Sequence, residues 1–225
     1  MEDTETKDMA ESVDIKKGTL VIVRHQESEW NKKGLWTGSR DINLTPYGFE
    51  ESKELGLKVH DIPFDNAFAS MQVRSIETLS CMLDVDCEYN VPTEHSASLN
   101  ERDYGDYTGK NKWDMEEVLG EEKFEQVRRG WDIPIPNGET LKMVYERVVP
   151  FYLEKVVPLL NVGKNVLVVS HGNAIRALIK YIENISDEDI SSVEMIFSSI
   201  LIYNTDTDGH MINKEVRSIE LPDEK

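Results

Sequence analysis

Two histidines stand just after short apolar runs, and their side chains are the ones in this sequence best placed to do chemistry. The run Leu20–Val23 leads into Arg24 and His25, and the run Val166–Val169 leads into His171. Short runs rich in β-branched residues that end in polar ones are typical of buried strands that open into a site. Ligands gather at the carboxyl ends of strands in open α/β sheets, so the two histidines predict phosphoryl or acyl chemistry at one sheet edge.

His25 is the candidate nucleophile. A neutral imidazole attacks phosphorus, and a histidine with an ordinary pKa of about 6.5 is mostly neutral at pH 7. Phosphoryl transfer spreads negative charge over the equatorial oxygens, so catalysis needs positive charge and hydrogen-bond donors around the transferred group. No metal is predicted, because neither His25 nor His171 belongs to a metal-ligand spacing pattern.

The elements that must position these histidines alternate between strands and helices. This alternation predicts a three-layer α/β/α sandwich with a mostly parallel central sheet. Strands are expected near residues 20–23, 65–70, 89–95, 166–170, 200–203 and 216–219. Helical stretches are expected from Pro46, over 72–83, over 112–129, over 139–160 with a bend at Pro150, over 173–181, and from Ser186.

The composition predicts one soluble domain. With 225 residues and 39% hydrophobic content, residues 16–225 can form a single catalytic domain around one core, preceded by a flexible acidic tail over 1–15. No apolar run approaches the roughly 20 residues that span a bilayer, so we expect a cytoplasmic protein. Cys81 and Cys87 match no metal or redox spacing and are expected to be reduced thiols.

The net charge of −18 argues against nucleic acid or an anionic membrane as a partner. A small anionic ligand would need local cations to overcome that field. The sequence has such cations in or beside its motifs: Arg24, Arg74, Lys112, Arg128 and Arg129.

Six sequence blocks, in order, resemble the cofactor-dependent phosphoglycerate mutases of the histidine phosphatase superfamily. They are Val23–His25 with Glu27–Asn31, Trp36–Gly38, Leu99–Gly105, Gly109–Lys112, Arg128–Gly130 and His171–Asn173. The similarity extends from Thr19 to about Tyr203, and it implies the sandwich fold expected above. It also implies a phosphohistidine on His25, and such a mechanism needs no metal.

The resemblance assigns a role to each matching residue. Arg24, Arg74 and His171 would surround the transferring group, with Asn31, Thr37 and Asn173 as neutral donors and backbone N–H groups near Gly38 and Gly172 facing the anion. Glu101 would be the proton donor and acceptor for the substrate hydroxyl. Tyr104, Lys112, Arg128 and Arg129 would hold the distal phosphate and the carboxylate of a phosphorylated glycerate.

The implied activity is interconversion of 3-phosphoglycerate and 2-phosphoglycerate in glycolysis and gluconeogenesis, primed by 2,3-bisphosphoglycerate. The same residues would also serve a bisphosphoglycerate mutase/phosphatase or a broad-specificity histidine phosphatase. A non-catalytic paralogue that only binds phosphorylated metabolites is a further alternative. The intact set Arg24, His25, Arg74, Glu101 and His171 argues against that alternative.

Three departures from the family pattern qualify the expectation. Gln26 stands where the family has glycine, and a positive φ there would cost a side chain about 1–2 kcal/mol. Without that strain, Gln26 would either crowd the phosphate or donate a hydrogen bond to it. The connection between Gly130 and Asn137 is short, which predicts an open pocket and a monomer or loose homodimer. The segment 195–199 lacks the family's Pro-Thr-Gly run and provides no assigned site residue.

Overall fold

The computed structural model describes residues 17–84, 90–194 and 197–219, so the expected tail over 1–15 and Cys87 lie outside the described residues. Its described strands form one sheet in the order β3-β2-β4-β1-β5-β6. The strands are β1 Thr19–Arg24, β2 Asn66–Ser70, β3 Thr93–Ser96, β4 Val166–Ser170, β5 Ser199–Thr205 and β6 Met211–Ser218.

The sheet is mostly parallel, as expected. β1, β4, β2 and β3 run in the same direction, whereas β5 is antiparallel to both β1 and β6. β1 and β4 lie in the middle of the sheet, and the apolar side chains of both are almost completely buried. A near-continuous apolar run is what a strand covered on both faces requires.

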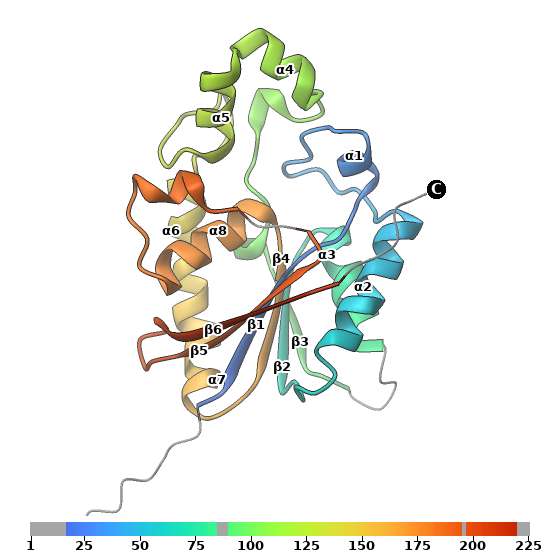
Figure 1. Cartoon of the computed structure of the whole chain (residues 1–225), viewed down its shortest axis with the longest axis vertical. Helices are drawn as coiled ribbons and strands as arrows, with labels where there is room; N and C mark the ends of the chain where they lie inside the picture. The colour runs from blue at the N-terminus through green and yellow to red at the C-terminus, as the bar shows by residue number, and fades with distance from the viewer. Residues whose placement is uncertain (1–16, 85–89, 195–196, 220–225) are drawn as a thin grey trace, which may run out of the picture.

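Helices cover both faces of the sheet (Figure 1). The described α-helices are α1 Glu29–Lys32, α2 Pro46–Lys58, α3 Val73–Leu83, α4 Lys112–Leu119, α5 Glu121–Arg129, α6 Leu141–Phe151, α7 Val157–Asn161 and α8 Gly172–Ile182. In β1, Leu20 and Ile22 point into the core beneath α6 and α8, while Val21 and Val23 point into the core beneath α2 and α3. This alternation is the period-two pattern of a strand, and it builds the three-layer sandwich.

Helices α4 and α5 project beyond the carboxyl ends of the central strands (Figure 1). They surround a small separate core of Trp36, Met115, Phe124, Val127 and Ile135. The expected single helical stretch over 112–129 is broken at Gly120, whose φ of 78° ends α4. Glycine adopts this φ without strain, so the chain can turn and start α5.

Two other helical expectations are modified. The stretch 139–160 is helical from Leu141 to Asn161, but it passes through a π-helical turn, Tyr152–Val156, directly after α6, which contains Pro150. The helix expected from Ser186 is a capped turn followed by a 3₁₀ helix, Asp189–Ser192. Arg176 donates to the carbonyl oxygens of Ile190 and Val193 at the end of this segment. Among the described helices, none is long and apolar enough to cross a membrane.

Candidate active site

Both histidines lie where the central parallel strands end. β1 and β4 pair in register, so Arg24 stands opposite Ser170, and the His25 amide donates to the Ser170 carbonyl oxygen at 2.9 Å. The imidazole rings of His25 and His171 are 4.8 Å apart between centroids, and both side chains are at most 2% exposed. The sheet therefore brings together two residues that are far apart in the sequence.

The hydrogen bonds of His25 define its tautomer. Its Nδ1 lies 2.8 Å from the carbonyl oxygen of Gln26, which can only accept, so Nδ1 carries the proton and Nε2 keeps its lone pair. Burial, with Arg74 and Arg24 close by, holds the pKa of His25 well below its ordinary value of 6.5. The imidazole is therefore neutral at pH 7, as a nucleophile must be.

Arg74 reaches the same point from α3. Its Nε donates to Nε2 of His25 at 3.3 Å, and its Nη1 and Nη2 donate to the carbonyl oxygens of Arg40 and Gly38. Burial lowers the pKa of Arg74 to about 10, so the guanidinium remains charged at neutral pH. This fixed cation lies at the atom that would receive a phosphoryl group.

His171 is the N-cap residue of α8, and its Nε2 is hydrogen bonded to the Ser70 hydroxyl at 2.7 Å. Burial, followed by Arg74 and His25, holds the pKa of His171 well below 6.5. Its Nδ1 and the Oγ1 of Thr37 are buried and have no hydrogen-bond partner among the described residues. Buried polar groups are nearly always paired, so these two atoms suit hydrogen bonds to a bound anion.

The buried space around His25, Arg74 and His171 is called the inner chamber below. Glu101 lies between the inner chamber and the first turn of α8. Its Oε1 accepts from its neighbour's amide, that of Arg102, at 2.7 Å, and from the backbone N–H and Nδ2 of Asn173, both at 3.2 Å. The same Nδ2 donates to the Tyr104 hydroxyl at 2.9 Å. A carboxylate at a helix N-terminus is stabilised by the N–H groups there, which hold Glu101 in one orientation.

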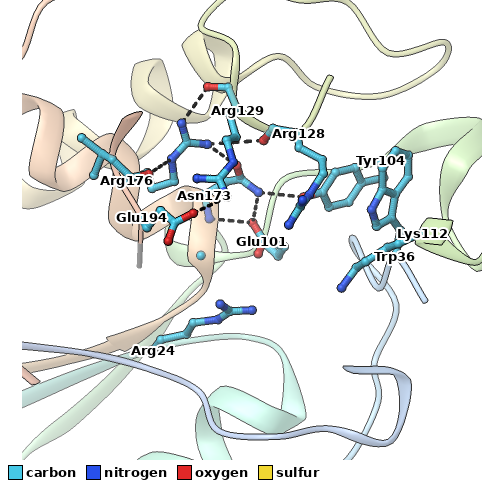
Figure 2. A pocket seen from close by; sticks show the side chains of 12 residues that line it. Arg24, Trp36, Glu101, Tyr104, Lys112, Arg128, Arg129, Asn173, Arg176 and Glu194 are labelled. Atoms are coloured by element: carbon cyan, nitrogen blue, oxygen red, sulfur yellow. Dashed lines mark hydrogen bonds and ion pairs between the residues drawn. The ribbon is translucent and has the colours of Figure 1, made fainter. Parts of the chain in front are cut away.

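A second group of cations lies further out, on the projecting helices (Figure 2). Lys112 begins α4, and burial together with Arg24 and Arg128 lowers its pKa to about 8. Arg128 and Arg129 end α5 with 38% and 27% of their side chains exposed. Both pair with Glu125, and Arg129 also pairs with Glu194.

Two cavities connect the two groups. A volume of about 50 Å³ is lined by His25, Asn31, Thr37, Gly38 and Arg74, among others. A volume of about 260 Å³ is lined by Arg128, Arg129, Gly172, Asn173, Arg176 and Glu194, among others. Both are also lined by Arg24, Trp36, Glu101, Tyr104 and Lys112, so the side chains of these five residues face both spaces.

The structure thus places every residue that the resemblance assigned to the site around these two cavities, except His171, whose ring packs against His25. Asn31 also accepts at Oδ1 from the Ser28 hydroxyl, so its Nδ2 is the end that can donate to a ligand. The expectation that Gln26 would crowd or contact the phosphate is wrong. Gln26 is not among the residues with positive φ, lines neither cavity, and directs its side chain to the backbone of Arg24 and Ser198.

Sequence reasoning missed several side chains that hold the site in place. Gln72 is buried, donates to the Gly38 carbonyl oxygen and accepts from the Glu101 amide. Arg176 donates to the carbonyl oxygens of Arg128 and Arg129 and so fixes the end of α5. The signal for Arg176 was available, because it is an arginine in the apolar run Ala174–Leu178, one helical turn after Asn173. Nothing in the local sequence distinguishes Gln72.

A metal site is not evident in residues 17–84, 90–194 and 197–219, where no group of three or more His, Cys, Asp or Glu residues could hold an ion. Cys81 is a free, half-buried thiol whose pKa is raised by burial, and it lies outside both cavities.

Known proteins are similar to this chain in sequence over most of its length. The model of the histidine phosphatase superfamily (branch 1) matches residues 20–215. A protein of Parvibaculum lavamentivorans named 2,3-bisphosphoglycerate-dependent phosphoglycerate mutase is 40% identical over 88% of this chain and 95% of its own length. A protein of the same name from a Bradyrhizobium species is 42% identical over 87% of this chain and 95% of its own length.

Solved structures agree on the fold. A putative alpha-ribazole-5'-P phosphatase from Escherichia coli superposes with a TM-score of 0.71 at 24% identity, covering 91% of this chain and 97% of its own. A phosphoglycerate mutase from Bacillus anthracis superposes with a TM-score of 0.69 at 23% identity, covering 91% of this chain and 94% of its own. At this identity the likeness establishes the architecture alone.

Proposed function

The chain belongs to the histidine phosphatase superfamily and, within it, to the enzyme family of 2,3-bisphosphoglycerate-dependent phosphoglycerate mutases, and on that premise we propose that it interconverts 3-phosphoglycerate and 2-phosphoglycerate. The observation that supports this most is the geometry at His25. A neutral Nε2 lies against Arg74 at 3.3 Å, next to cavities lined by Glu101 and the outer cations.

In the first step, the lone pair of His25 Nε2 attacks the phosphorus of a bound phosphate ester. The P–O bond to the glycerate breaks, and the leaving oxygen takes a proton from Glu101. Arg24, Arg74 and His171 stabilise the charge that develops on the equatorial oxygens, because buried, pre-oriented donors stabilise such charge more than water does. The Gln26 carbonyl oxygen stabilises the positive charge that Nδ1–H acquires as Nε2 forms its new bond.

In the second step, the free 2-hydroxyl of 3-phosphoglycerate attacks the phosphorus of phospho-His25. Its proton passes to Glu101, the P–N bond breaks, and the electron pair returns to Nε2, which leaves 2,3-bisphosphoglycerate in the site. Transfer of the 3-phosphoryl group to His25, by the chemistry of the first step, then releases 2-phosphoglycerate. One carboxyl group therefore acts as acid and then as base. The hydrogen bonds from Asn173 and Arg102 keep it in a fixed orientation for both roles.

The outer cations bind the part of the glycerate that does not react. A bisphosphorylated glycerate carries two phosphates of about −1.5 to −2 each at pH 7 and one carboxylate. Arg24, Arg74, Lys112, Arg128 and Arg129 supply five positive charges of comparable size. The residues present therefore suit 2,3-bisphosphoglycerate, which would supply the phosphoryl group that first loads His25.

The proposal is tested by incubating the enzyme with 3-phosphoglycerate, with and without a catalytic amount of 2,3-bisphosphoglycerate. We expect 2-phosphoglycerate to form at a rate that depends on the bisphosphate. Release of inorganic phosphate alone would instead identify a phosphatase, and binding without turnover would identify a metabolite-binding protein. Either result would overturn the proposal.

A further inference from the structure

A phenylalanine covers the phosphate-binding arginine. The ring of Phe197 lies 3.6 Å from the Arg24 guanidinium carbon and stands nearly edge-on to His25, with ring centroids 6.3 Å apart. Phe197 is half-buried and lines neither cavity. The ring therefore covers a part of Arg24 and His25 that does not face the substrate.

The residue after Phe197 is fixed by three hydrogen bonds. The Ser198 amide donates to Gln26 Oε1 at 3.2 Å, and its hydroxyl donates to Glu51 Oε1 at 2.7 Å. Its carbonyl oxygen accepts from the Ile219 amide at 3.1 Å. Ser198 has a φ of 62°, which a residue other than glycine adopts at a cost of about 1 kcal/mol or more, so these bonds maintain an unfavourable turn.

Gln26 connects that turn to the nucleophile strand. Its side chain is completely buried, and its Nε2 donates to the Arg24 carbonyl oxygen at 2.5 Å while its Oε1 accepts from Ser198. Its backbone amide donates to the Thr78 hydroxyl, and its own carbonyl oxygen accepts from His25. A glycine at this position would leave the Ser198 amide without this acceptor.

We propose that Gln26 is a positioning residue that holds Phe197 over Arg24, and that the Phe197 ring shields phospho-His25 from water. The inference rests on the proposed function, and it concerns how phospho-His25 divides between two acceptors. When water attacks, a P–O bond forms, the P–N bond breaks, the electron pair returns to Nε2, and inorganic phosphate leaves with both protons of the water. When the glycerate hydroxyl attacks, the same bonds change and phosphoglycerate leaves.

The Phe197 ring slows the attack by water and not the attack by the glycerate hydroxyl. Water needs no binding site of its own, so it reaches the phosphorus through any opening beside His25. The glycerate reaches it only through the cavities, which Phe197 does not line. Removing the ring therefore opens a route that only water can use. Phospho-His25 should then hydrolyse faster, because exclusion of water protects a reactive intermediate from hydrolysis.

The test measures the half-life of phospho-His25 in the absence of an acceptor, after loading with ³²P-labelled 2,3-bisphosphoglycerate. It is combined with the ratio of phosphate release to 2-phosphoglycerate formation. We expect Phe197→Ala to shorten the half-life and to raise the ratio by about threefold to tenfold. Phe197→Leu, which keeps an apolar side chain of similar reach, should retain most of the protection. The ratio is decisive, because loss of the stacked ring also changes the surroundings of Arg24, and an effect that acts equally on both reactions cancels in the ratio.

Gln26→Met tests whether the hydrogen bonds of Gln26, and not only the volume of its side chain, hold Phe197 in place. Methionine fills a similar volume but makes neither hydrogen bond, so the variant should change the half-life in the same direction as Phe197→Ala and by a smaller factor. Gln126→Met on the exposed side of α5 is the matched control and should change neither quantity. Thermal melting of each variant establishes that it is folded, and Gln26→Met and Phe197→Leu keep the test usable if Phe197→Ala is not.

Failure of this inference differs from failure of the proposed function. If Phe197→Ala and Gln26→Met leave both the half-life and the ratio unchanged, the shield is refuted while the mutase remains. If the unaltered enzyme loads His25 but forms no 2-phosphoglycerate, the mutase is refuted, and the half-lives still decide whether Phe197 protects the phosphoenzyme. An enzyme that neither 2,3-bisphosphoglycerate nor p-nitrophenyl phosphate loads contradicts both.

Discussion

The inner chamber around His25 and the outer cation group around Arg129 differ in their burial and in the elements that carry their side chains. His25, Arg74 and His171 are at most 2% exposed and belong to the ends of sheet strands or to helices packed on the sheet. Arg128 and Arg129 are 38% and 27% exposed and belong to helix α5, which projects beyond the sheet.

Their charges are also balanced differently. The outer arginines, Arg128 and Arg129, form ion pairs with the carboxylates of Glu125 and Glu194. Arg74 instead donates to His25 and to backbone carbonyl oxygens. A bound anion would therefore compete with carboxylates for the arginines of the outer group, whereas it would meet an already oriented cation in the inner chamber. On the proposed mechanism, we therefore expect the inner chamber to stabilise the transition state and the outer group to bind the substrate.

The largest effect should follow from removing the nucleophile. His25→Asn keeps a polar side chain but lacks a nucleophilic nitrogen, because the lone pair of an amide nitrogen is delocalised, so kcat should fall by at least about a thousandfold. Steady-state assay of 2-phosphoglycerate formation measures it. His95→Asn, which changes an exposed histidine on β3, is the control and should retain full activity. Near-normal turnover by the His25 variant would remove the inner chamber from the mechanism.

Glu101 lines both cavities, so its variant tests whether this residue acts in catalysis, like the inner chamber, or in binding, like the outer group. Glu101→Gln keeps the hydrogen bonding of the side chain but cannot exchange a proton, and kcat should fall by about 10²- to 10⁴-fold. Calorimetric titration with 3-phosphoglycerate should give an affinity within a few-fold of the unaltered enzyme. Glu121→Gln at the start of α5 serves as the control. A loss of affinity with unchanged kcat would make Glu101 a binding residue instead.

The outer group is tested by two changes with opposite signs. Arg129→Gln removes a cation and should raise KM by about tenfold to a hundredfold with little change in kcat, since a charge-assisted hydrogen bond contributes about 1.5–3 kcal/mol. Glu194→Gln removes a carboxylate that competes with the substrate and should lower KM by about twofold, as expected for an exposed ion pair. If both variants raise KM, Glu194 assists binding and the displacement argument fails.

The pH dependence of kcat/KM should show an acid limb from His25 in the inner chamber and a basic limb from Lys112 in the outer group. Burial and the arginines lower the pKa of His25, so its neutral form persists below pH 6.5, and protonation removes activity only at lower pH. The pKa of Lys112 is lowered to about 8, so above that pH the free enzyme loses a binding cation and kcat/KM falls. Lys112→Arg should move the basic limb to higher pH and leave the acid limb in place. A basic limb that does not move would exclude Lys112 as its cause.

The inner chamber was largely predictable from the sequence because its signals are local. Apolar runs that end in His25 and His171 predict strands, and the parallel pairing of β1 and β4 brings their ends together. The N-terminal cap of α2 and the boundaries of α3 also follow from short-range patterns. Thr45 accepts from the Gly48 amide as an N-cap, and Pro46 opens α2.

The remaining features depend on contacts between distant segments. The fate of the Gln26 side chain was not predictable, since its partner Ser198 is 172 positions away. The pairing of Arg129 with Glu194 likewise requires α5 to pack beside the segment that follows α8. Gly120 is different, because a glycine inside a helical pattern disfavours the helix by about 1 kcal/mol, so the break between α4 and α5 had a local signal.

The most direct test of the account is to trap the phosphoenzyme and follow where its phosphoryl group goes. The enzyme is loaded with ³²P-labelled 2,3-bisphosphoglycerate, freed of excess donor and mixed with unlabelled 3-phosphoglycerate. We expect label on the peptide that contains His25, none in His25→Asn, and transfer of the label to glycerate products faster than to inorganic phosphate. Label on another residue, or release mainly as inorganic phosphate, would contradict a mutase that works through phospho-His25.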